Sequence, residues 1–86
     1  MALFRVTQEF PLVGDPPTQA TTDRVRQRLD DAAPGTGAAV DVGIGRMQVE
    51  MTFEAESEER AVRMAKMTSD RALGSGPARV DVQRAT

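Results

Sequence analysis

The most chemically versatile side chains are three carboxylates, Asp41, Glu50 and Asp81, each within a short segment of alternating polar and apolar residues. Carboxylate oxygens that converge on one point can hold Ca²⁺ or Mg²⁺. These three are expected on separate strands with arginines among them, and the sequence contains no Asp-x-Asp-x-Asp-Gly loop. We therefore expect no specific metal site and no cofactor.

A second candidate is the segment Gly43-Ile44-Gly45-Arg46, whose backbone N–H groups and arginine could bind an anion. A phosphate-binding loop usually opens a helix. This segment instead separates two runs of alternating apolar residues, which is typical of a β-hairpin. The pattern favours a hairpin turn over an anion site.

The residue types that dominate active sites are missing from this chain. It has no His and no Cys, which removes the commonest general base and the commonest soft metal ligands. The net charge is −2, from 11 basic and 13 acidic residues, so there is no basic excess for nucleic-acid binding. No apolar run approaches the roughly 20 residues that span a bilayer, and the N-terminal residues lack a secretory signal pattern. We expect a cytoplasmic protein that is not an enzyme and binds neither nucleic acid nor membrane.

These side chains must be positioned by six elements that the sequence predicts. Alternation of apolar residues predicts strands, and apolar residues spaced three and four apart predict helices. Loop residues, including Gly14 and Asp15-Pro16-Pro17, separate the first strand from the first helix. The expected elements are a strand over 3–10, a helix over 18–33, a hairpin formed by 38–42 and 46–53, a helix over 57–73 and a strand over 79–84.

The second helix has the clearest boundaries. Ser57 is a natural N-cap, and Gly74 is well placed to end the helix. Met64 and Met67 lie beside its apolar stripe, either as fillers of gaps in the core or as a contact for a partner. The expected stripe consists of Ala61, Val62, Ala65, Thr68, Ala72 and Leu73.

The hairpin also predicts its own register. A two-residue loop at Ile44-Gly45 sets Val42 opposite Met47 and Val40 opposite Val49, so that the apolar faces coincide; a four-residue loop would keep the same register. One residue disturbs the alternation of the first strand, because Gln8 stands where an apolar residue is expected. We expect Gln8 to lie near an edge or a bulge, the alternative being a buried amide with a functional role.

Every predicted strand has one apolar and one polar face, and each helix has one apolar stripe. Two layers satisfy this pattern, with the helices on the apolar side of a four-stranded sheet. Right-handed crossovers then predict a ferredoxin-like βαββαβ fold of the α+β class, an α/β plait with an antiparallel sheet in the order 4-1-3-2. We expect a single domain over residues 1–86. A swapped or barrel-like dimer built from the same elements is the alternative.

The uncovered polar face of this sheet is the candidate interaction face. Alternation places Arg5 toward Glu50 and Glu9 toward Arg46, with Arg79 also toward Glu9, and opposite charges on neighbouring strands attract. The face is therefore either a solvated surface that neutralises its own charge or a surface covered by a partner. Its candidate residues are Arg5, Thr7, Glu9, Arg46, Gln48, Glu50 and Asp81.

Three classes of function remain open. We expect a small non-catalytic protein-interaction or assembly domain, which forms a homo-oligomer or binds another protein. Its contact would be the open sheet face or the edge strand at Ala38–Val42, where Asp41 is the one outward charge. The alternatives are a regulatory module that binds a small ligand and an enzyme whose site is built at a subunit interface.

Overall fold

The computed structural model describes residues 1–14 and 17–85 of the chain. Within them lie four strands and two helices, in the predicted order. Asp15 and Pro16, which the sequence assigns to the loop before the first helix, lie outside the described residues. The elements are β1 (Ala2–Pro11), α1 (Gln19–Ala32), β2 (Ala39–Gly43), β3 (Arg46–Ala55), α2 (Glu58–Leu73) and β4 (Arg79–Arg84).

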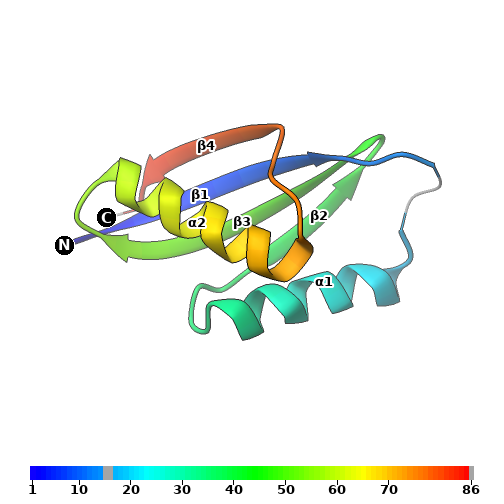
Figure 1. Cartoon of the computed structure of the whole chain (residues 1–86), viewed down its shortest axis with the longest axis horizontal. Coiled ribbons are helices and arrows are strands. Elements are labelled where there is room, and N and C mark those ends of the chain that lie inside the picture. Colours follow the sequence, from blue (N-terminus) through cyan, green and yellow to red (C-terminus); the bar gives the residue numbers. More distant parts are fainter. Residues whose placement is uncertain (15–16, 86) are drawn as a thin grey trace.

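The four strands form one antiparallel sheet in the order β2-β3-β1-β4, which is the predicted order 4-1-3-2 read from the other side. Helix α2 packs against β1, β3 and β4, whereas α1 packs against α2 and β2. Both helices lie on the same side of the sheet (Figure 1). The chain therefore has the ferredoxin-like α+β plait, and the described residues leave one face of the sheet uncovered.

The β2–β3 hairpin has the predicted register, with Val42 opposite Met47 and Val40 opposite Val49. Gly43 pairs directly with Arg46, so the loop consists of Ile44 and Gly45 alone. Gly45 takes the left-handed conformation, with φ of +71°, and Ile44 does not. A β-branched residue such as Ile disfavours positive φ, and the neighbouring glycine removes that conflict.

Both helices begin at residues whose side chains accept a hydrogen bond from the first turn. The Thr18 side chain accepts from Thr21 N–H, and the Ser57 side chain accepts from Arg60 N–H. Helix α2 ends at Gly74, whose φ of +73° closes the last turn with a hydrogen bond from its N–H to Asp70 O. The predicted N-cap and C-cap of α2 are confirmed.

The core lies between the sheet and the helices and is built from aliphatic, Met and Phe side chains. Val6, Val49 and Met51 are fully buried on the two central strands, and the small residues Ala61 and Ala65 let α2 approach them closely. In α1 only Leu29 is buried to this degree. The buried apolar residues are Phe4, Val6, Phe10, Leu29, Ala38, Met47, Val49, Met51, Phe53, Ala55, Ala61 and Ala65.

The expectation for Gln8 was wrong. Gln8 lies neither at an edge nor at a bulge: it pairs with Val49 on β3 and with Val80 on β4, and its side chain is fully buried. The Ser69 hydroxyl on α2, which is also fully buried, donates a hydrogen bond to Gln8 Oε1. A buried polar group needs a partner, and Ser69 supplies one from an element that the local strand pattern does not include.

Candidate interaction face

The structure places all seven candidate residues on the uncovered face of the sheet, which we call the open face. On β1, β3 and β4 they alternate with residues turned toward the core. Thr7, Glu9 and Gln48 are half-buried between neighbouring strands, and the others are exposed. The residues of the open face are Arg5, Thr7, Glu9, Arg46, Gln48, Glu50 and Asp81.

Two ion pairs join β1 and β3 across the open face, as predicted. Arg5 Nε lies 3.4 Å from Glu50 Oε1, and Arg46 Nη1 lies 3.4 Å from Glu9 Oε1. Both pairs run diagonally across the ladder, since the residue opposite Arg5 is Thr52 and the residue opposite Glu9 is Gln48. The open face therefore neutralises much of its own charge and shows no strong field of one sign.

Arg79 adjoins these seven residues on the same side of the sheet. It lies directly opposite Glu9 in the β1–β4 ladder, as predicted. The Glu9 carboxylate nevertheless pairs with Arg46, and no ion pair joins Arg79 to a carboxylate of the described residues. A shallow hollow of about 490 Å³ lies at this end of the face, lined by Thr7, Glu9, Arg46, Gln48, Arg79, Val80 and Asp81.

The hollow offers two guanidinium groups, two carboxylates and one amide. These groups can donate and accept hydrogen bonds with a polar ligand or with another chain. The three carboxylates considered for a metal lie apart: Asp41 is on β2, and β1 separates Glu50 on β3 from Asp81 on β4. Within residues 1–14 and 17–85, no group of three or more His, Cys, Asp or Glu is placed to hold a metal ion.

The Gly43–Arg46 segment forms the hairpin turn that its pattern favours. Gly45 O accepts a hydrogen bond of 3.0 Å from Leu12 N–H, which ties the turn to the chain after β1. The Arg46 side chain points to Glu9 across the open face. The arginine expected at an anion site is thus engaged in an ion pair.

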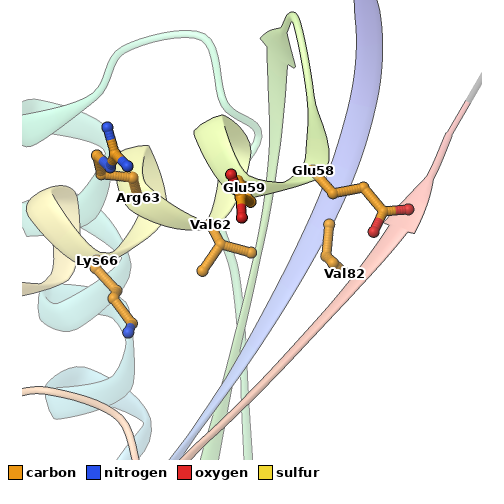
Figure 2. A pocket seen from close by; sticks show the side chains of 6 residues that line it. All are labelled: Glu58, Glu59, Val62, Arg63, Lys66 and Val82. Atoms are coloured by element: carbon orange, nitrogen blue, oxygen red, sulfur yellow. The ribbon is translucent and has the colours of Figure 1, made fainter.

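A second surface feature was not predicted from the sequence. A groove of about 420 Å³ lies between the first half of α2 and the outer strand β4. Figure 2 shows Val62 of α2 and Val82 of β4 in this groove, with Glu58 beside Val82. Both valines are half-buried, although the sequence pattern turns both toward the core. The groove is lined by Glu58, Glu59, Val62, Arg63, Lys66 and Val82.

The two methionines of α2 differ in environment. Met64 is half-buried and packs against the core, whereas Met67 is 60% exposed. Met64 therefore fills the flank of the core. Met67 lines a small groove between the two helices, together with Ala32, Ala33 and Arg71.

Comparison with known proteins adds no relative: no protein-family model matches the chain, and no curated protein matches it. No helix within the described residues is long and apolar enough to cross a membrane. The fold and the two surfaces described above are therefore the basis for a functional proposal.

Proposed function

We propose that this domain is a small, non-catalytic assembly module of the cytoplasm that associates with itself. The observation that carries the proposal is that the sheet has an edge strand at each end. The outer strands β2 and β4 each pair on one side only within the described part of the chain. An edge strand with free backbone groups is a template for a further strand.

Two further features support self-association. The chain has 86 residues and three aromatic side chains, and domains of this size bury a modest share of their surface when alone. Burial of an additional surface between two copies would stabilise each of them. The self-neutralised open face also presents little like-charge repulsion to a second copy.

Sedimentation equilibrium over a hundredfold range of protein concentration tests this proposal. We expect the weight-average mass to rise from that of one chain, 9.3 kDa, toward twice that value. A single species with the mass of one chain at every concentration would reject self-association.

The second candidate is a module that binds a small polar ligand in the hollow of the open face. The observation in its favour is Arg79, which lies beside the Arg46–Glu9 ion pair and has no ion pair of its own among the described residues. Amino acids carry charges of both signs that match such a site. A thermal-shift screen with amino acids and nucleotides, repeated on Arg79→Ala, separates the two candidates. Ligand binding predicts a stabilisation that the variant loses, whereas an assembly module predicts no response.

A further inference from the structure

We propose that the second copy binds along β4, so that the two β4 strands pair antiparallel about a two-fold axis at Val82 and the two sheets become one. This inference depends on the proposed self-association and specifies its surface. It selects β4 over the open face and over β2, the edge that the sequence pattern favoured. Backbone direction and register support it.

The backbone of β4 has hydrogen-bonding groups that point away from the rest of the sheet. Ala85 N–H donates to Leu3 O on β1, and successive residues of an antiparallel strand turn their N–H and C=O groups to alternate sides. Arg79, Asp81 and Gln83 therefore bond toward β1. The groups of Val80, Val82 and Arg84 point away from β1, where the described part of the chain places no other strand.

Symmetry leaves few ways to pair two such strands. The two-fold axis must lie between a residue and the same residue of the second copy if the outward N–H and C=O groups of the two strands are to bond with one another. An axis at Val80 pairs only 79–81, and an axis at Gln83 pairs only 82–84. An axis at Asp81 brings two Asp81 carboxylates face to face, which repels. An axis at Val82 pairs all of 80–84.

The register centred on Val82 also matches side chains. Val82 meets Val82 of the second copy, and Val80 meets Arg84. On the other face Asp81 lies beside Gln83 of the second copy, whose amide can donate to the carboxylate. This register contains no pair of like charges.

Helix α2 brings charges close to the same axis. Val62 lines the groove together with Val82, so the second copy lies against this side of α2. Glu58 lies beside Val82 (Figure 2), so an axis at Val82 brings Glu58 of the two copies near each other. This repulsion opposes pairing and is screened by salt, so the β4 dimer should be tighter at high salt than at low salt.

The other surfaces fit a second copy less well. In the central register of strand β2, Asp41 would face the Asp41 carboxylate of the second copy, which repels. The charged groups at the centre of the open face are already paired within the chain.

Disulfide trapping tests the assignment directly, because the chain has no cysteine of its own. In the proposed register the two Val82 Cα atoms lie about 5.5 Å apart, within the range that a disulfide spans. Three single-cysteine variants are compared under mild oxidation: Val82→Cys, Val40→Cys on the β2 edge and Gln48→Cys on the open face. We expect Val82→Cys to form a reducible dimer at least about tenfold faster than the other two, since association holds its thiols at an effective concentration on the order of mM.

Trapping of Val40→Cys or Gln48→Cys at the rate of Val82→Cys, or a higher one, would overturn the β4 interface. The trapping result is interpreted together with sedimentation of the unmodified protein. A dimer in sedimentation without trapping at Val82 rejects the interface and leaves self-association standing. A monomer at every concentration rejects both.

A charge change on α2 provides a second, independent test. Glu58→Gln removes the carboxylate beside Val82 and should tighten dimerisation by about twofold to tenfold at low salt, since it removes a like-charged contact across the axis. Asp31→Asn, at an exposed position on α1, changes the net charge in the same way and should have no effect. An unchanged or weaker dimer in Glu58→Gln, or an equal effect of Asp31→Asn, would contradict the β4 interface.

Discussion

The Ser69 hydroxyl of α2 donates a hydrogen bond to Gln8 Oε1 at the centre of the sheet, and both side chains are fully buried. The other end of the same amide, Nε2, has no hydrogen-bond partner among the described residues. Burial of an unpaired polar atom costs free energy. This contact therefore ties α2 to β1, but it contributes less to stability than a fully hydrogen-bonded amide would.

Ser69→Ala should lower the free energy of unfolding by about 1–3 kcal/mol, because it leaves the buried Gln8 amide with no partner at either end. Combining it with Gln8→Met, which keeps a similar volume, should bring the free energy of unfolding back to that of the original protein or above it. Urea denaturation of the two single variants and the double variant measures this coupling. Additive losses in the double variant would contradict it.

Val49→Asp should unfold the domain, because Val49 is fully buried on a central strand and an unpaired charge there costs several kcal/mol, about 3 or more. Its neighbour Gln48 faces the open side of the sheet. Gln48→Asp should therefore cost about 2 kcal/mol at most, from repulsion by Glu9 and Asp41, which lie directly opposite. Thermal melts followed by circular dichroism compare the two variants. Equal melting temperatures would show that the register of β3 had been misassigned.

Gly74→Ala should destabilise the protein by about 1 kcal/mol, because an alanine at a φ of +73° is strained. No atom would obstruct the added Cβ, so backbone conformation alone is tested. Gly76 is the matched control: its added Cβ is also unobstructed and its φ is not positive. Gly76→Ala should be neutral or slightly stabilising in the same urea titration. An equal loss in both variants would exclude the left-handed cap as the cause.

Glu50→Gln should change the free energy of unfolding by less than about 1 kcal/mol, because the ion pair with Arg5 is half exposed and screened by solvent. The difference should shrink further in about 1 M salt, where the screening length falls to roughly 3 Å. Denaturant midpoints at low and high salt measure both effects. A large loss that persists in high salt would indicate that the Arg5–Glu50 pair is more important to the fold than its exposure indicates.

Local sequence determined most of the fold. The hairpin register follows from the alternation of Val40 and Val42 against Met47 and Val49, since a slip of one residue would turn an apolar face to water. The caps of α2 follow from Ser57 and Gly74. The Ser57 side chain and the Gly74 N–H each form a hydrogen bond with a group about one helical turn away. The open face follows from the same alternation, because residues two apart share one side of a strand.

Tertiary structure decided what depends on residues far apart in the chain. Gln8 is buried because Ser69, 61 positions later, meets its amide, and no strand pattern contains that partner. Val62 and Val82 line one groove because α2 leaves the outer side of β4 uncovered, although each valine alone has the pattern of a core residue. The sequence by itself thus determined which side of each element is apolar. Only the packing of the helices on the sheet decided which polar residue is buried and which apolar residues stay half exposed.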